Sequence, residues 1–420
     1  MMAKVWLAGL VFFGAIAGAN AQEGSAEMLR DHLYSGRLAE GLAVLEARAD
    51  NDASAAFGVG ILTFFSAIES LVQPLYAHGF NPERGIAVGP LFGLAWDDTD
   101  QERVPEPLTY AQLRGYLAQF SNQMDAAVSA LLTASEGEFA IEIDVTRIRI
   151  DINGDGEADD EETVGAFLAM ASSAGQRLDL DSGVAPDLGL PATTFALDNS
   201  DAIWLAGYAH ILAIPSDFFL AHDFEDFFNA GMHRLFPGAE LPMETYPDGG
   251  QLFMDRDSDA LLADAIAIVH TLNWPVIDRE RLMGVKDRMV SIIELSRQNW
   301  NAILAETDDH LEFVPSPYQT PLAPQMTVTK AMVEAWRETL DVSEAILNGE
   351  LLLPHWRYEN LGFDLLAWFE TAERTDAVLL LTGSDALPYL KSGEIADAQT
   401  FDAANTVFGG SIWNYAAWFN

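Results

Sequence analysis

Residues 151–162 are the stretch of this chain whose side chains most clearly could do chemistry. They read Asp-Ile-Asn-Gly-Asp-Gly-Glu-Ala-Asp-Asp-Glu-Glu. This run matches D-x-[DN]-x-[DN]-G-x5-E at every fixed position, which is the spacing of a calcium loop. Ca²⁺ prefers roughly six to eight oxygen ligands in a flexible shell. Oxygen-bearing side chains at alternate positions can supply that shell, because they converge as the backbone wraps around one ion.

The expected ligands all offer an oxygen atom, and they are Asp151, Asn153, Asp155, Glu157, Asp159 and Glu162. Glu157 would bind through its backbone carbonyl, and Asp159 directly or through a water. Glu162 would close the shell with both carboxylate oxygens. Gly156 permits the sharp turn, because glycine reaches positive φ without a steric penalty. The carboxylates would repel one another until the ion bridges them.

The run resembles the loop of EF-hand proteins, but the segments on either side of it differ from that pattern. Residues 139–145 alternate between apolar and polar side chains, which predicts a strand. The apolar phase then shifts to Ile148, Ile150 and Ile152, and a bulge or bend near Thr146 and Arg147 would explain the shift. Residues 163–170 predict a helix. A strand–loop–helix unit is more similar to the dockerin-type variants, although a dockerin needs two repeats.

Ala158 stands where paired EF-hands usually carry a branched apolar residue, so the site is expected to be unpaired. The second acidic run is Asp255, Asp257 and Asp259. It has Ala260 where the pattern needs glycine. The start of a helix is the preferred interpretation, because Asp is favoured there by capping and by the helix dipole. A second cation site is the alternative.

Common catalytic motifs are absent from the sequence. It contains no Gly-x-Ser-x-Gly elbow, no His-Glu-x-x-His, no phosphate loop and no dinucleotide fingerprint. The absence of cysteine excludes thiol chemistry and disulfides. His222 and Glu225 could share a helix face, with His233 downstream, but a di-metal site would need a second such pair. Acid pairs for glycoside hydrolysis stay open, because 64 carboxylates offer too many candidates.

The composition describes an acidic chain able to form a large core. Asp and Glu number 64 against 22 Lys and Arg, and 50% of the residues are hydrophobic. The formal net charge of −42 disfavours nucleic acid and anionic membranes as partners. We prefer to explain this charge as a surface that keeps the protein soluble in salt. A specific cationic partner is the alternative.

The first 21 residues predict a secretory signal peptide. Lys4 supplies the positive start, residues 5–18 the apolar stretch and Ala19-Asn20-Ala21 the cleavage site. The apolar run is shorter than a typical membrane span. We expect the mature chain to begin near Gln22 and to reach the periplasm or the extracellular medium, without insertion into the membrane.

The apolar periodicity predicts a mainly α-helical fold, arranged as a multi-helix array or bundle with a small β element before the single calcium loop. Residues 24–62 resemble a tetratricopeptide-type hairpin, but no further copy follows at a period of about 34 residues. The other predicted helices share an apolar stripe; they cover 110–133, 199–236 (two helices or one helix bent at Pro215), 260–272, 284–305 and 328–348. Residues 377–382 predict a short strand.

The predicted organisation has a signal peptide over 1–21 and the hairpin over 22–80. A helical domain over 81–420 would contain the strand–loop–helix unit at 138–170. Exported bacterial proteins that combine an export signal, helical repeats and such a loop are similar, but they imply no particular activity. The preferred function is a non-catalytic protein with one structural calcium ion, which binds an unknown protein or small-molecule ligand. A secreted hydrolase supported by calcium is the alternative.

Overall fold

A computed structural model describes most of the chain: residues 23–81, 104–166, 193–244, 254–396, 400–408, 416 and 418–420. Within these ranges the fold is mainly helical, with small antiparallel sheets at its edges. The prediction of a mainly α fold with a small β element is therefore confirmed. The predicted signal peptide lies outside the described residues.

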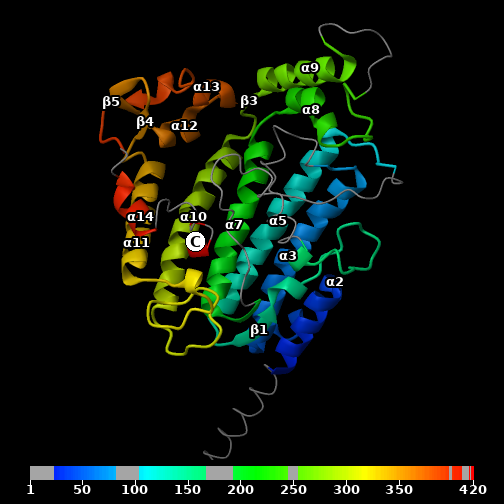
Figure 1. Cartoon of the computed structure of the whole chain (residues 1–420), viewed down its shortest axis with the longest axis vertical. Helices are drawn as coiled ribbons and strands as arrows, with labels where there is room; N and C mark the ends of the chain where they lie inside the picture. Colours follow the sequence, from blue (N-terminus) through cyan, green and yellow to red (C-terminus); the bar gives the residue numbers. More distant parts are fainter. Residues whose placement is uncertain are drawn as a thin grey trace, which may run out of the picture.

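Long helices in chain order form the centre of the molecule and lie side by side (Figure 1). They are α3 (Ala53–Ala77), α5 (Tyr110–Ser135), α7 (Asn199–Ala221) and α10 (Arg279–Ile303). Neighbouring helices run antiparallel. For example, Arg114 near the start of α5 donates a hydrogen bond to the carbonyl of Leu220 at the end of α7, at 2.9 Å.

Each of these helices begins at a residue whose side chain accepts a first-turn N–H. The caps are Asp52, Thr109, Asp198 and Asp278. Such a bond satisfies one of the unpaired donors at a helix start and stabilises it by about 1 kcal/mol. The helices predicted at 110–133 and 284–305 correspond to α5 and α10. Because Asp278 caps α10, that helix begins earlier than its apolar stripe suggested.

Residues 23–35 form a helix that is followed by α2 (Leu38–Glu46) and a 3-10 turn, η1 (Ala49–Asn51). Both helices pack with α3, as a helical hairpin would. One core joins Leu29 and Leu38 of this region to Phe120 of α5 and Phe195 of the sheet. The division at 80/81 and the likeness to tetratricopeptide hairpins stay predictions.

The strand expected before the calcium loop is β1 (Ala140–Asp144), which pairs with β2 (Thr194–Asp198). Ile141 and Ile143 are buried in the strand, and Ile148 is buried after it. The expected change of phase therefore occurs. Its cause is a 3-10 turn, η2 (Val145–Arg147), rather than a bulge.

Smaller elements surround the central helices. They are α8 (Glu225–Gly231), η3 (Met232–Arg234), α9 (Arg256–Thr271), β3 (Asn273–Pro275), η4 (Pro324–Met326), α11 (Lys330–Leu347), β4 (Leu353–His355), β5 (Tyr358–Phe363), α12 (Leu365–Thr371), β6 (Arg374–Asp376), α13 (Ala377–Leu381), η5 (Leu387–Tyr389), β7 (Leu390–Lys391) and α14 (Asp402–Val407). β3 pairs with β6, and β5 pairs with both β4 and β7. The helices predicted at 260–272 and 328–348 correspond to α9 and α11.

The strand predicted at 377–382 is wrong, and one of the two alternatives for residues 199–236 is excluded. Residues 377–381 form helix α13 rather than a strand, because the Asp376 side chain caps it by accepting the Leu379 N–H at 2.8 Å. Pro215 lies inside α7, so the chain is not divided into two helices at this residue. The break in the predicted 199–236 segment comes at His222 and Asp223, between α7 and α8.

The end of the chain packs into the core. The Phe419 side chain is fully buried, and its carbonyl accepts the indole N–H of Trp300 at 2.9 Å. Trp418 is partly buried beside it. Trp413 and Tyr415 lie outside the described residues.

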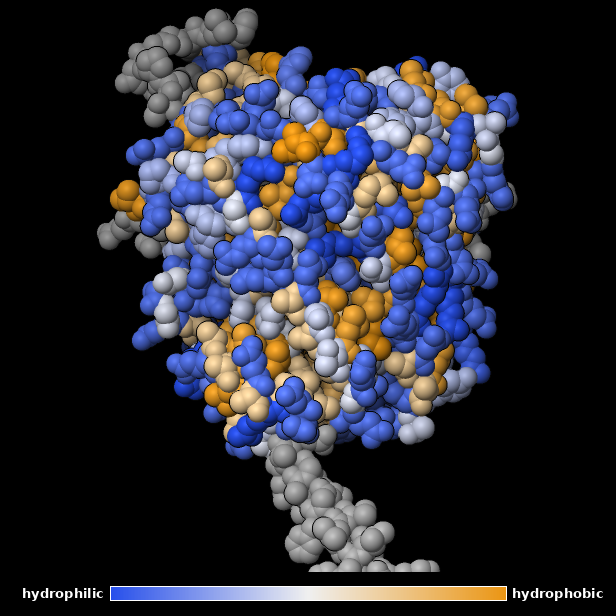
Figure 2. Space-filling model, turned by 180° about the vertical axis from the view of Figure 1, so that it is seen from behind, coloured by the Kyte–Doolittle hydropathy of each residue, from blue (hydrophilic) through white to orange (hydrophobic). Residues whose placement is uncertain are grey.

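Within the described residues, α3 and α7 are long and apolar enough to cross a membrane by length and composition alone. In their most apolar windows, 56% and 50% of the residues are buried inside the protein, and core helices of soluble proteins give the same signal. Seen from behind, the molecule is covered mostly by hydrophilic residues with apolar patches among them (Figure 2).

Candidate metal centre

The two ends of the loop at 151–162 are held together by backbone pairing. Arg149 and Thr163 form an isolated antiparallel bridge. The Ile150 N–H donates to the Glu162 carbonyl at 3.0 Å. Residues 164–166 are helical, so a helix follows the loop as predicted, while residues 167–170 lie outside the described part of the chain. This pairing places the first and last expected ligands next to each other.

The loop turns sharply at its glycines. Gly156 has φ +88° and Gly154 has φ +75°, a region that side chains rarely adopt. Both N–H groups donate to the Asp151 carboxylate, Gly154 to Oδ1 at 2.7 Å and Gly156 to Oδ2 at 3.0 Å. Gly156 therefore has the role expected of loop position 6.

The middle of the loop is a series of short turns made by its own side chains. Asn153, Asp155 and Asp159 each accept the N–H of the residue two positions later, at 2.8, 2.8 and 2.9 Å. Each of these bonds uses one side-chain oxygen. Within the described residues, the second carboxylate oxygen of Asp155 and of Asp159 has no hydrogen bond, so both remain available to a cation.

Glu162 folds back across the start of the loop. Its Oε1 accepts the N–H groups of Ile152 and Asn153 at 2.8 and 3.1 Å, and its Oε2 accepts that of Asp159 at 3.1 Å. The side chain is only 6% exposed, and Asp151 is 7% exposed. In the described part of the chain, no Lys or Arg forms an ion pair with either carboxylate. The N–H groups that these carboxylates accept offset part of the cost of burying them, and a bound cation would remove the remaining repulsion between the two charges.

Helix α3 contributes a third acid, Glu69, which no motif in the sequence singles out. Burial, together with the charges of Asp151 and Glu162, raises the pKa of Glu69 to about 7, and the nearby N–H of Asp151 partly offsets the rise. One turn further along α3, Gln73 Nε2 donates to the Asp151 carbonyl at 2.9 Å. Because these residues lie far from the loop in sequence, no local pattern could have identified them.

The donors of the loop suit calcium, but they are not gathered around one point. Within the described ranges, no three His, Asp or Glu side chains are placed to hold a metal ion together. The oxygens of Asp151 and Glu162 instead accept N–H groups of the loop itself. Carboxylate, amide and carbonyl oxygens are the ligands that Ca²⁺ prefers. The residues therefore fit the ion in type and order, and binding would require their oxygens to exchange N–H bonds for the cation.

The second acidic run has the interpretation preferred from the sequence. Asp255 caps α9, with Oδ1 accepting the Ser258 N–H at 3.0 Å and Oδ2 the Ser258 hydroxyl at 2.7 Å. Its oxygens are therefore occupied in starting the helix.

The histidines near the α7–α8 break do not form a metal site. His222 Nδ1 contacts the Phe218 carbonyl at 2.7 Å, and Nε2 contacts the Thr375 hydroxyl at 2.8 Å. His233 pairs instead with Asp264 at 3.0 Å. Both imidazoles thus have local partners in the protein.

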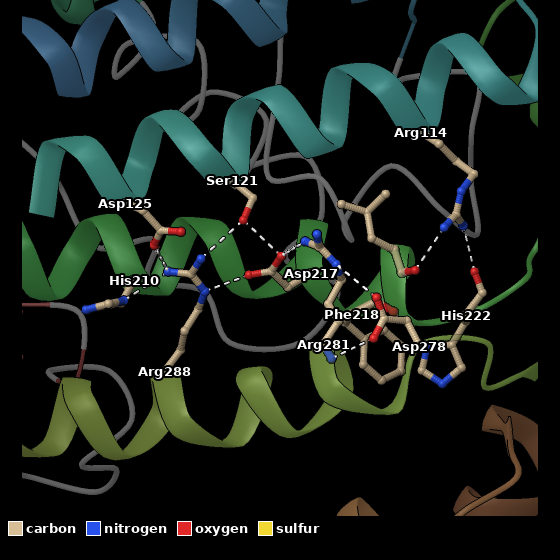
Figure 3. A network of polar contacts seen from close by, with 11 residues as sticks. Arg114, Ser121, Asp125, His210, Asp217, Phe218, His222, Asp278, Arg281 and Arg288 are labelled. Carbon is tan, nitrogen blue, oxygen red and sulfur yellow. Dashed lines mark hydrogen bonds and ion pairs between the residues drawn. The ribbon is translucent and has the colours of Figure 1, made fainter.

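A polar cleft of about 540 Å³ lies between α5, α7 and α10. Figure 3 shows its centre, where Arg281 and Arg288 point at Asp217. Arg281 reaches Asp217 Oδ1 at 2.5 Å, and Arg288 Nε reaches Oδ2 at 2.6 Å. Ser121 Oγ also donates to Oδ1, at 2.9 Å. These partners use both oxygens of Asp217, which makes it the centre of an ion-pair network between helices.

At the rim of this cleft, Arg288 also donates to Asp125 and to His210 Nδ1, at 2.6 and 3.1 Å. Burial, and secondarily the charge of Arg288, lowers the pKa of His210. A neutral imidazole that accepts from a guanidinium at Nδ1 carries its proton on Nε2. The Nδ1 lone pair of His210 is therefore occupied by the Arg288 guanidinium.

Comparison with protein families, with curated proteins and with solved structures finds no match for this chain.

Proposed function

We propose that this chain is an exported protein that binds one structural calcium ion in the loop at 151–162. The observation that carries the proposal is the burial of Asp151 and Glu162 side by side, with no Lys or Arg paired to either within the described residues. A divalent cation between them would remove their repulsion. Export rests on the pattern of the first 21 residues, which indicates a periplasmic or extracellular location.

The ligands would be Asp151, Asn153, Asp155, Asp159 and Glu162, with the Glu157 carbonyl. Bound calcium supplies charge neutralisation and a rigid link between the two ends of the loop. Extracellular modules bind calcium at roughly 10⁻⁴ to 10⁻³ M. At about 100 times the dissociation constant, binding would stabilise the fold by roughly 2.7 kcal/mol.

Within this proposal the protein is a binding module without catalysis, and its partner is an unknown protein or a small molecule. The strongly acidic surface argues against nucleic acid as a partner.

Calcium titration by calorimetry on the chain from Gln22 onward tests the proposal. Asp151→Asn and Glu162→Gln remove one ligand charge each, while Glu161→Gln removes an exposed loop charge that is not expected to bind. We expect one ion per chain, at least tenfold weaker binding in the two ligand variants and a nearly unchanged affinity in the control. Melting curves should shift upward with calcium in the wild type. Absence of binding up to 10 mM calcium would refute the proposal.

A further inference from the structure

The loop at 151–162 packs against helix α3. The calcium pattern itself covers only the twelve residues of the loop and includes no residue of α3. We infer that Glu69 and Gln73 of α3 are part of the calcium centre: they hold the first ligand residue from outside the loop, so that calcium fastens α3 to it. The inference rests on the proposed function. Both side chains are positioning residues, since they act through Asp151.

Side chains of α3 contact both the carbonyl and the N–H of Asp151. Its carbonyl accepts a hydrogen bond from Gln73 Nε2 at 2.9 Å, and its N–H lies against the Glu69 carboxylate. The same Gln73 amide also reaches Glu69 Oε1, at 3.4 Å. The Asp151 side chain is thereby left to face the loop, where it accepts the two glycine N–H groups. Such outer partners orient metal ligands, and their loss typically weakens metal binding 10- to 100-fold.

Apolar packing makes the same contact stiff. Ile150 and Ile152, on either side of Asp151, are 5% and 8% exposed. They belong to one buried cluster with Val72 of α3, and Ile68 and Leu71 pack against it. Because a close-packed interior transmits small displacements, a shift of Asp151 on ion binding would be felt by this turn of α3.

A second contact ties the loop to the helices that precede α3. The Arg149 N–H donates to the Leu33 carbonyl at 2.9 Å, and the Arg149 guanidinium donates to the Ala158 carbonyl at 2.8 Å. Gly36 adopts φ +69°, and a Cβ there would lie 2.4 Å from the Ala158 Cβ. The small residue at loop position 8 therefore faces the turn after the first helix. It makes a contact within the chain at the position where paired EF-hands contact a second loop.

Charge gives Glu69 a role that Gln73 does not have. Glu69 faces Asp151 and Glu162, and no Lys or Arg within the described residues forms an ion pair with any of the three. Glu69 is an acid beside the first ligand residue, whereas Gln73 is neutral, so only Glu69 can add negative charge near the ion. Replacing it by glutamine keeps a hydrogen-bond acceptor of the same size and removes only the charge.

Two variants test the inference, with calcium affinity measured by calorimetry in one buffer at one pH. Gln73→Leu removes the bond to the Asp151 carbonyl, and Glu69→Gln removes the charge. We expect each to bind calcium about tenfold more weakly than the wild type. Glu69→Asp, which restores the charge, should recover part of the affinity. Glu46→Gln, an exposed change on α2, serves as the control for charge and should have no effect.

A second measurement follows α3 itself. Binding and stabilisation are reciprocal, so calcium should slow amide hydrogen exchange in residues 66–77 of the wild type. In Gln73→Leu this protection should largely disappear at saturating calcium. If the wild type binds calcium while both variants keep its affinity and its protection, the inference is wrong and the proposed function stands. If the wild type binds no calcium, both fail. Should Gln73→Leu misfold, the comparison of Glu69→Gln with Glu69→Asp still decides.

Discussion

Replacing Asp217 by alanine should destabilise the protein strongly without touching the loop at 151–162. Asp217 is 7% exposed in its side chain, and it joins α7 to two arginines of α10 and to Ser121 of α5. Removing one member of a buried ion pair costs about 3–5 kcal/mol, because the remaining charge is left without a partner. Arg288 is only 11% exposed, but it keeps its bond to Asp125. Arg281 is 32% exposed and can reach water.

These compensations place the expected loss at the lower end of that range, about 3 kcal/mol. Urea unfolding followed by tryptophan fluorescence, in chelator, measures it. Asp125→Asn is the matched control, since that carboxylate binds the same Arg288 but is 53% exposed, and it should cost less than about 1 kcal/mol.

A double variant, Asp217→Leu with Arg288→Met, separates unpaired charge from lost packing. Apolar replacement of a buried pair is often neutral or stabilising, so it should recover part of the loss of Asp217→Ala. The reasoning is refuted if the free energy of unfolding of Asp217→Ala lies within 1 kcal/mol of the wild-type value. It is also refuted if the double variant is less stable than Asp217→Ala.

Two further predictions concern backbone conformation and pH. Gly156→Ala should destabilise the protein by roughly 1–2 kcal/mol, because alanine is strained at φ +88°, whereas Gly115→Ala, in an open position of α5, should stabilise it by about 0.5–1 kcal/mol. Urea titrations showing the same sign for both would contradict this. Burial, with the charges of Asp198 and Glu312, raises the pKa of Glu306 from 4.5 to about 7, although Gln319 donates to it. The folded state therefore holds this proton, and its contribution to stability is lost as pH rises from about 5 through 7. In chelator, Glu306→Gln should reduce the decline in melting temperature between pH 5 and pH 8, and an equal decline in both proteins would exclude this explanation.

The sequence was most informative where structure depends on neighbours along the chain. The apolar stripe at 328–348 corresponds to α11, and the phase shift after residue 145 corresponds to η2. The loop at 151–162 could be recognised because its spacing and its glycine are local properties. Short apolar runs were less informative: the run at 377–382 predicts a strand, whereas the side chain of Asp376 caps a helix there.

Features built from distant residues could not be predicted. Glu69 and Gln73 meet Asp151 only because α3 passes beside the loop, and Asp217 meets Arg281 and Arg288 only because α7 packs on α10. The residue types of these helices do not show which side chains will be in contact in the folded protein. Pro215 gave a misleading local signal, since α7 lies between two long helices and continues across the proline.

The length of the turn η2 limits the insertions and deletions that this chain can tolerate. Before it, Ile141 and Ile143 enter the core shared with β2, and after Ile148 the chain passes to the second core, where Ile150 and Ile152 are buried. A strand shifted by one residue turns every side chain to its opposite face. Adding or deleting one residue in this turn would therefore rotate Asp151 away from α3 while leaving the loop sequence intact. The length of the turn sets the phase between two hydrophobic cores, so a change of length there should be far more harmful than a substitution of the exposed Arg147.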